Sequence, residues 1–191
     1  MLLQTSKIYD RLRSTIIPLN SIDEALPKKG AITELGCGQG VIAKYLAKRK
    51  DRKVLGIDLN AQRIGKSQVK NLRFKVGDIT NLSYKPQDGF VISDVLHHIN
   101  YSDQKRLLAK LYKALKKNGT LVIKEIDARE FLRSRLSRFW DYIFYPDDKI
   151  YYRNSDELET YLGNLGFDIN VQRASRFFPG STTLFICKKN A

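Results

Sequence analysis

Apolar residues in this chain alternate between short continuous runs and helix-like spacings. Continuous runs bounded by glycine or polar residues predict buried strands, whereas apolar positions three and four residues apart predict helices packed on a sheet. Five strands are predicted in the first two thirds of the chain: around 31–33, in a run that ends at Gly56-Ile57, and at 71–76, 90–93 and 120–126. Helices are predicted between them, at 39–50, after Asn60, and from Ser102 to Lys117.

The last third of the chain continues the alternation. A helix is predicted from Asn154 or Ser155 to Gly166, followed by strands at 167–171 and 183–187 with a turn around Pro179-Gly180. Alternating strands and helices predict a parallel α/β sheet that is covered by helices on both faces. The short connection between the last two strands predicts that the final strand is antiparallel.

A glycine-rich turn joins the first strand to the first helix, with the sequence Glu34-Leu35-Gly36-Cys37-Gly38-Gln39-Gly40. Glycines lack the Cβ atom that would keep a ligand away from the backbone N–H groups. Asp58 follows Gly40 by eighteen residues and ends the second strand, where a carboxylate can accept hydrogen bonds from both ribose hydroxyls. Together these features predict a nucleoside-binding site.

The spacing of the glycines separates two classes of ligand. The motif G-x-G-x-x-G is typical of proteins that bind nicotinamide cofactors. Here the third glycine comes one place early, and Val41 occupies the position of the last glycine. A pyrophosphate needs room at that point, whereas a ligand with an amino acid tail does not. The turn therefore favours S-adenosylmethionine (SAM) over NAD.

Four predicted strands each end near a carboxylate: Glu34, Asp58, Asp78 and Asp94. For each acid taken alone, a solvated loop residue or a helix cap is the favoured interpretation. Ligands of open α/β sheets bind outside the carboxyl ends of the strands. Because parallel strands bring these ends together, the four acids predict a single site.

These motifs resemble those of the class I SAM-dependent methyltransferases over residues 28–127. The glycine turn resembles their first motif, Gly77-Asp78-Ile79 their adenine-contacting loop, residues 94–99 their fourth motif, and 115–123 the turn and strand after their fourth helix. The resemblance implies one methyltransferase domain over residues 1–191, with a Rossmann-like, doubly wound, seven-stranded sheet that is mostly parallel. It implies SAM as cofactor, S-adenosylhomocysteine as product, and no metal. The implied cofactor-binding residues are Glu34, Gly36, Cys37, Gly38, Gly40, Asp58, Leu59, Asp78, Ile79, Asp94 and Val95.

Composition and charge limit the other possibilities. The 191 residues, 42% hydrophobic and 28% charged, are typical of one globular domain. Cys37 and Cys187 are too far apart for a disulfide framework or a metal motif, and without a signal peptide or an 18-residue apolar run we expect a cytoplasmic protein. The net charge of +14 is typical of partners such as RNA or an anionic membrane. Runs such as Lys48-Arg49-Lys50 and Lys116-Lys117 lie at the ends of predicted helices, where cations complement the helix dipole, and for these runs solvated surface is favoured.

Two segments exceed what the cofactor fold needs. Residues 128–153 carry an aromatic and apolar helical face around Trp140, beside Arg129, Arg133, Arg135 and Arg138. This segment is either a helix packed on the sheet, a lid over an apolar or planar acceptor, or a helix at a membrane surface. Residues 1–27 can supply a second cover.

His97 and His98 are the only histidines, and both follow the fourth strand, where the methyl acceptor should lie. An imidazole can accept a proton at neutral pH, although one of two adjacent histidines can equally pack locally. The sequence thus predicts SAM-dependent methyl transfer to a small-molecule or lipid-like acceptor. Two alternatives remain: an RNA methyltransferase, and a non-catalytic SAM-binding regulatory or scaffold protein.

Overall fold

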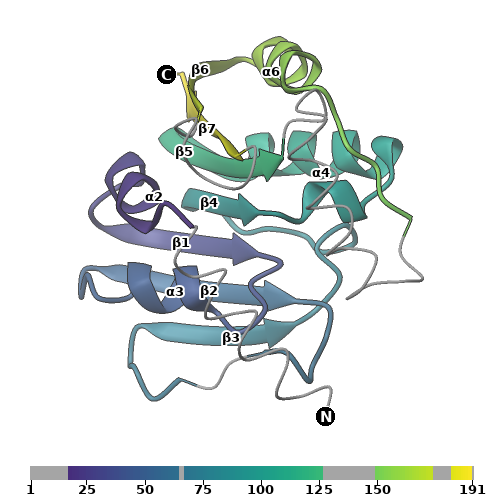
Figure 1. Cartoon of the computed structure of the whole chain (residues 1–191). Helices are drawn as coiled ribbons and strands as arrows, with labels where there is room; N and C mark the ends of the chain where they lie inside the picture. The colour runs from purple at the N-terminus through teal and green to yellow at the C-terminus, as the bar shows by residue number, and fades with distance from the viewer. Residues whose placement is uncertain (1–16, 65–66, 127–148, 174–181, 191) are drawn as a thin grey trace.

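A single seven-stranded sheet forms the centre of the computed structural model, which describes residues 17–64, 67–126, 149–173 and 182–190. The strand order is β3-β2-β1-β4-β5-β7-β6, as Figure 1 shows. β1 to β5 are parallel, and β7 runs antiparallel to both β5 and β6. The predicted mostly parallel sheet with an antiparallel last strand is therefore confirmed. The strands are β1 Gly30–Leu35, β2 Arg52–Asp58, β3 Leu72–Val76, β4 Gln87–Ser93, β5 Leu115–Ile126, β6 Phe167–Arg173 and β7 Thr182–Lys189.

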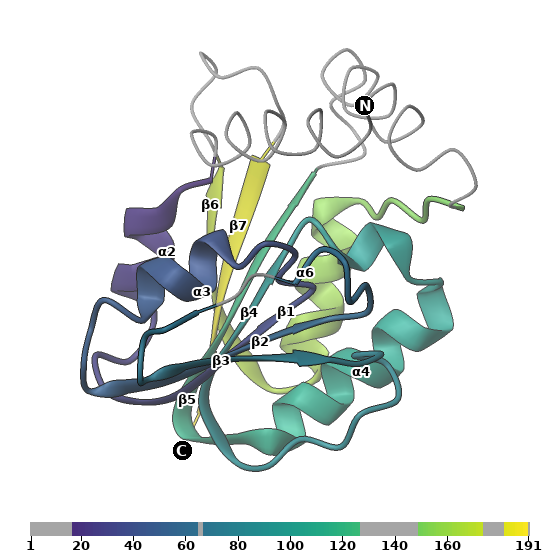
Figure 2. The ribbon, with the colours of Figure 1, turned by 90° about the horizontal axis from the view of Figure 1, so that it is seen from below.

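Helices cover both faces of the sheet (Figure 2). α2 (Leu19–Ala25) and α3 (Val41–Leu46) lie on one face, and α4 (Tyr101–Ala114) and α6 (Ser155–Asn164) lie on the other. Alternate residues of β5 supply the two cores: Val122 packs with the residues of α2 and α3, and Ile123 with those of α4 and α6. None of the described helices is both long and apolar enough to span a bilayer.

The strand order reverses between β1 and β4. From β1 the chain winds outward to β2 and β3, and from β4 it winds the other way to β5. In doubly wound sheets this reversal opens a crevice at the carboxyl ends of the two central strands, and ligands bind there. We call this side, where β1 to β5 end, the carboxyl end of the sheet, and the opposite side the amino end.

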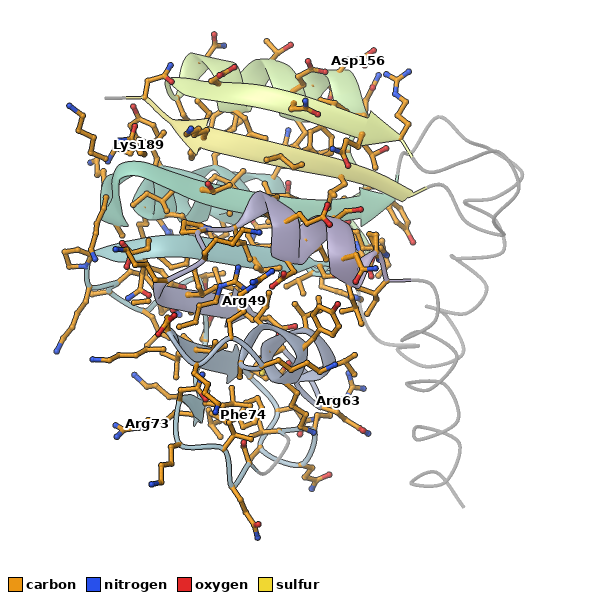
Figure 3. The ribbon with its side chains drawn as sticks, turned by 90° about the vertical axis from the view of Figure 1, so that its left-hand side faces the viewer. Arg49, Arg63, Arg73, Phe74, Asp156 and Lys189 are labelled. Carbon is orange, nitrogen blue, oxygen red and sulfur yellow. The ribbon has the colours of Figure 1, made fainter. Side chains whose placement is uncertain are left out.

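A buried charge network fixes α2 at the amino end. The Arg52 side chain is fully buried, and its Nη1 donates to Oδ1 of Asp23 at 2.5 Å. Arg49, labelled in Figure 3, donates to the same carboxylate. The hydrogen bond from Arg49, followed by that from Arg52, outweighs burial and lowers the pKa of Asp23. The network therefore ties α2 to β2 and to the turn after α3.

The described residues after Asn60 do not form the predicted helix. Residues 61–63 form a turn in which the N–H of Gln62 donates to Oδ1 of Asn60 at 2.9 Å. Asparagine side chains satisfy nearby backbone groups and so compete with helix formation. That prediction was wrong within the described residues.

Two helix boundaries also differ from the prediction. The first helix keeps only α3 of its predicted span 39–50. α4 begins one residue before Ser102 because Asn100, rather than Ser102, accepts from the N–H of Asp103, and it ends at Ala114 rather than Lys117. Leu115 pairs with Gln87 of β4 and is 2% exposed. Burying Leu115 in the sheet therefore overrides the good helix propensity of Leu115-Lys116-Lys117.

Candidate functional site

The glycine turn lies at the carboxyl end of β1, where Gly36, Gly38 and Gly40 all have positive φ. A Cβ on Gly36 would lie 2.3 Å from Cγ2 of Val95, so the turn packs directly on the segment after β4. Among the residues that the structure describes, nothing would lie within 4 Å of a Cβ on Gly38. The turn thus closes the crevice floor at Gly36 and leaves open space over Gly38.

Asp58 reaches this turn from the carboxyl end of β2. Its Oδ2 accepts from the N–H of Gly38 at 2.7 Å, and its Oδ1 accepts from the N–H of Asn60 at 2.9 Å. A carboxylate offers about four lone-pair positions, so each oxygen can accept another donor. The structure therefore places the predicted ribose-binding acid beside the open space over Gly38.

Two further predicted residues support the turn from within. The Glu34 carboxylate is buried and accepts from the N–H of Ala43 at 2.7 Å, which holds the start of α3. Burial, reinforced by the nearby charges of Glu34 and Asp58, raises the pKa of the Cys37 thiol. Cys37 therefore stays protonated and acts as packing.

Asp78 and its neighbours occupy the loop after β3. Asp78 Oδ1 accepts from the N–H and the hydroxyl of Thr80, at 2.8 and 2.7 Å, and Oδ2 accepts from Asn81 at 2.6 Å. The Thr80 hydroxyl contributes most to lowering the pKa of Asp78. Ile79 is buried in the core, whereas Leu59 is 72% exposed beside Asp58. Asp78 thus shapes its own loop.

The segment after β4 is held from β5 by two adjacent residues that the sequence analysis missed. Lys124 Nζ lies 2.7 Å from each carboxylate oxygen of Asp94. Glu125 Oε1 accepts from the N–H groups of Val95 and Leu96, at 3.0 and 2.7 Å. Neighbouring residues of a strand point to opposite faces. Lys124 and Glu125 therefore contact residues 94–97 from opposite faces of the sheet.

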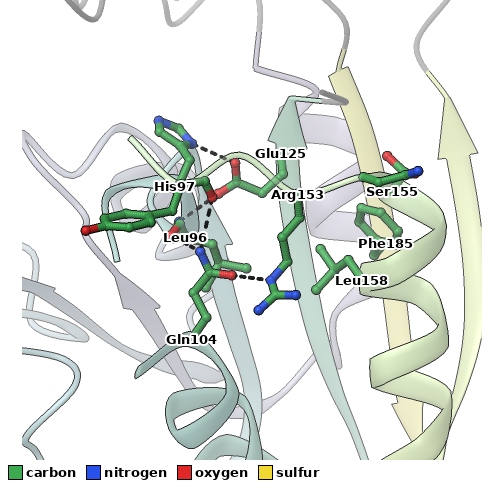
Figure 4. Close-up of a pocket in the computed structure, with 10 residues that line it drawn as sticks. Leu96, His97, Gln104, Glu125, Arg153, Ser155, Leu158 and Phe185 are labelled. Atoms are coloured by element: carbon green, nitrogen blue, oxygen red, sulfur yellow. Dashed lines mark hydrogen bonds and ion pairs between the residues drawn. The ribbon is translucent and has the colours of Figure 1, made fainter. Parts of the chain in front are cut away.

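His97 belongs to this constellation. Its Nδ1 lies 2.7 Å from Oε2 of Glu125 (Figure 4), the side chain is 3% exposed, and the ring stacks on Tyr152 with centroids 5.2 Å apart. When Nδ1 carries the proton donated to Glu125, Nε2 is the nitrogen that can accept one. The His98 ring lies 4.3 Å from the His97 ring, centroid to centroid. Of the two predicted histidines, the structure gives His97 the orienting carboxylate.

A small pocket lies behind His97, between α4, α6 and β5. Gln104, Arg153 and Ser155 line it together with His97 and Glu125 (Figure 4). The N–H of Tyr151 donates to the carbonyl oxygen of His97 at 2.7 Å. Arg153 Nε donates to Oε1 of Gln104 at 2.5 Å. These contacts join the described end of the predicted basic aromatic segment to the His97 loop.

The sequence carried one signal for the missed residues. Lys124 and Glu125 interrupt the apolar run of β5 near its carboxyl end, yet they are 5% and 7% exposed. Two adjacent charges in a buried strand need partners, since burying an unpaired charge is costly. The remainder of the predicted lid, 128–148, and the first sixteen residues of the predicted N-terminal cover lie outside the described residues.

Comparison with known proteins gives consistent matches. A family model described as a methyltransferase domain matches residues 7–172. A carboxy-S-adenosyl-L-methionine synthase from Helicobacter pylori is 30% identical over 112 residues, which cover 55% of this chain and 47% of that protein. A trans-aconitate 2-methyltransferase from Deinococcus radiodurans is 33% identical over 112 residues, which cover 56% and 42%. The chain thus spans about half the length of the curated relatives it matches.

A solved SAM-dependent methyltransferase from Archaeoglobus fulgidus has the same fold, with a TM-score of 0.75 at 17% identity over 94% of each chain. The family model covers most of the chain and spans the glycine turn, Asp58 and the His97 loop. This chain therefore belongs to the methyltransferase domain family.

Proposed function

We propose that this protein binds SAM at the carboxyl ends of β1, β2 and β4 and transfers its methyl group to a small-molecule acceptor. The proposal rests on one observation: the N–H of Gly38 donates a hydrogen bond to the Asp58 carboxylate, beside the open space over Gly38. A nucleoside needs a ribose acceptor next to a backbone without side chains, and these residues supply both.

The residues present fit the cofactor. Asp58 would hold the ribose hydroxyls. Room for the amino acid tail would be left by the three glycines of the turn. The loop at Asp78 and Ile79 would border the adenine. When bound, SAM supplies an activated methyl group on a sulfonium. The protein's task is then to align the acceptor with that methyl, which can remove about 7–11 kcal/mol of barrier in favourable cases.

His97 is the proposed base for an acceptor that must lose a proton. Glu125 orients the ring through Nδ1, and Nε2 takes the proton from the acceptor atom. That atom uses the freed electron pair to form its bond to the methyl carbon, while the electrons of the broken carbon–sulfur bond stay on sulfur. The contact between His97 and Glu125 argues against a purely regulatory or scaffold role, because an oriented imidazole is typical of acid–base catalysis.

The acceptor class is supported by the relatives. The names of those reported above point to small-molecule chemistry, and a lipid-like acceptor is included in the proposal. RNA is the second candidate, favoured by the net charge of +14. Its binding would fall steeply with salt, because phosphate contacts release counterions.

Calorimetry with SAM, S-adenosylhomocysteine and NAD tests the cofactor. We expect the first two to bind and NAD not to bind, because Val41 occupies the position of the last glycine in the NAD motif. Tight NAD binding without SAM binding would refute the proposal.

Transfer is tested with methyl-labelled SAM and metabolite, lipid and RNA fractions. For an acceptor that needs a base, His97→Gln should slow transfer by about 10²–10⁴-fold, and His98→Gln, the matched change, should slow it less. Equal losses in the two variants would remove His97 from the proposed role.

A further inference from the structure

Lys124 is a buried cation that the proposed chemistry does not yet use. Its side chain is 6% exposed, and both oxygens of Asp94 lie 2.7 Å from Nζ. A lysine ammonium carries three N–H donors. The two Asp94 oxygens take two of them, and the described residues offer no partner for the third.

Asp94 bears a second cost at the same place. It has φ +54°, in the left-handed region that non-glycine residues seldom adopt. A buried ion pair is also a weak source of stability, since well-packed apolar residues of similar volume do as well or better. Two unfavourable features at one residue, where ligands bind an α/β sheet, indicate a functional role.

The position of Lys124 indicates which ligand it meets. The cofactor crevice lies between β1 and β4, with the glycine turn on the β1 side. Lys124 is on β5, on the other side of β4 from that turn. It therefore lies on the acceptor side of β4. Lys124 contacts residue 94 from one face of the sheet, and Glu125 orients His97 from the other, so the two side chains hold the same loop.

We propose that Lys124 determines acceptor specificity by donating its third N–H to an oxygen of the acceptor that is, or becomes, anionic. The acceptor is then a carboxylate, or a hydroxyl that His97 deprotonates, and the methyl group forms an ester or an ether. This inference rests on the proposed function and narrows it. A cation beside the reacting atom stabilises a nucleophilic oxyanion. It disfavours an amine, which gains positive charge as it is methylated.

The chemical nature of the product tests the inference without any variant. Methyl-labelled SAM and the native protein are incubated with metabolite fractions, and the labelled products are sorted by mass spectrometry into O-, N- and C-methyl compounds. We expect O-methyl products. N-methyl or C-methyl products would overturn this inference alone, whereas no labelled product from any fraction would overturn the proposed transfer and this inference with it.

Substitutions of Lys124 then test whether its side chain causes the preference for an oxygen acceptor. Lys124→Met should lower kcat/KM for the O-methylated acceptor by about 10–100-fold, the worth of a charge-assisted hydrogen bond, and should change the Kd of SAM by less than about threefold. Lys124→Arg should restore part of the loss. Lys124→Gln keeps an N–H donor for Asp94 without the charge, so it should fold and still lose activity.

Lys116→Met is the matched control. Like Lys124, Lys116 lies on β5 and pairs with an aspartate, but its partner is Asp88 of β4 and the pair lies at the amino end of the sheet. Lys116→Met should leave kcat/KM unchanged. An unchanged kcat/KM in folded Lys124→Met, or an equal loss in Lys116→Met, would overturn the role of Lys124.

Discussion

In the part of the chain that the structure describes, two lysine–aspartate pairs join β5 to β4 or to the residue after it, one at each end of the sheet, and they differ in burial. At the amino end Lys116 pairs with Asp88, with side chains 48% and 25% exposed. At the carboxyl end Lys124 pairs with Asp94, with side chains 6% and 10% exposed. An exposed pair contributes about 0–1 kcal/mol, whereas a buried pair must first overcome the loss of hydration. Stability alone therefore does not explain why the buried pair lies at the carboxyl end.

The amino end also holds a buried cation, and its contacts differ from those of Lys124. Arg52 donates to Asp23 and to the backbone carbonyl oxygens of residues 23, 26 and 27. The protein itself thus supplies its acceptors, and the network fixes α2 on the sheet. At the carboxyl end the buried charges hold the loop of His97. The buried charges at the amino end hold a helix on the sheet, and those at the carboxyl end hold a loop of the candidate site.

The largest effect is expected from breaking the amino-end network. Asp23→Ala leaves Arg52 buried without its carboxylate, which typically costs about 3–5 kcal/mol of unfolding free energy. Urea unfolding measures the loss. Glu24→Ala, the exposed neighbour on α2, is the control and should change stability little. A folded Asp23→Ala protein with native stability would show that the network does not fix α2.

A buried carboxylate removed at the carboxyl end should affect activity more than stability. Glu125→Gln disturbs the acceptor of two backbone N–H groups and of His97, so we expect a loss of about 1–3 kcal/mol. For an acceptor that needs a base, transfer should also slow at least about tenfold, because His97 loses its orientation.

A double-mutant cycle separates these two effects of Glu125. If Glu125 acts through His97, Glu125→Gln should slow transfer little further in a His97→Gln background. Additive losses in rate would mean that Glu125 serves the site by another route.

Substituting an aspartate at each end of β2 should have a smaller effect, measured as a change in the affinity for SAM. Asp58→Ala should weaken SAM binding at least about tenfold, or about 1.4 kcal/mol, because it removes the carboxylate that is proposed to accept the ribose hydroxyls. Asp51→Ala, which removes the exposed aspartate just before β2, is the matched control and should leave affinity unchanged. Calorimetry decides, and unchanged affinity in folded Asp58→Ala would place the ribose elsewhere.

Local sequence predicted the strands and the glycine turn because both depend on neighbours in the chain. Apolar runs become buried strands, and glycines become positive-φ turns, so the sequence predicts where Gly36, Gly38 and Asp58 lie in the fold. The end of α4 was missed because Leu115 joins the sheet through Gln87, 28 residues earlier. Asn60 was read as a helix cap, although its side chain forms a turn instead.

The contacts of the site were harder to predict than its residues. His97 and Asp94 were candidates from position alone, but their partners Glu125 and Lys124 lie 28 and 30 residues away. No local pattern encodes that pairing, because it depends on β5 lying beside β4 in a fixed register. Lys124 and Glu125 stand in an apolar run, and their contacts with Asp94 and His97 become evident only when β5 is aligned with β4.

The smallest effect is expected at the exposed pair, and it should depend on pH. Burial raises the pKa of Asp88, but the hydrogen bonds from the N–H of Ala31 and from Lys116 outweigh it, so the pKa lies below its ordinary value. A carboxylate with a lowered folded pKa stabilises the protein above its unfolded pKa, about 3.9, and this contribution is lost as the pH falls through the folded pKa. Lys116→Met should therefore cost about 0–1 kcal/mol at neutral pH and less once Asp88 is protonated. Thermal unfolding of both proteins between neutral pH and about pH 2 tests this, and a loss that grows as the pH falls would contradict the assignment.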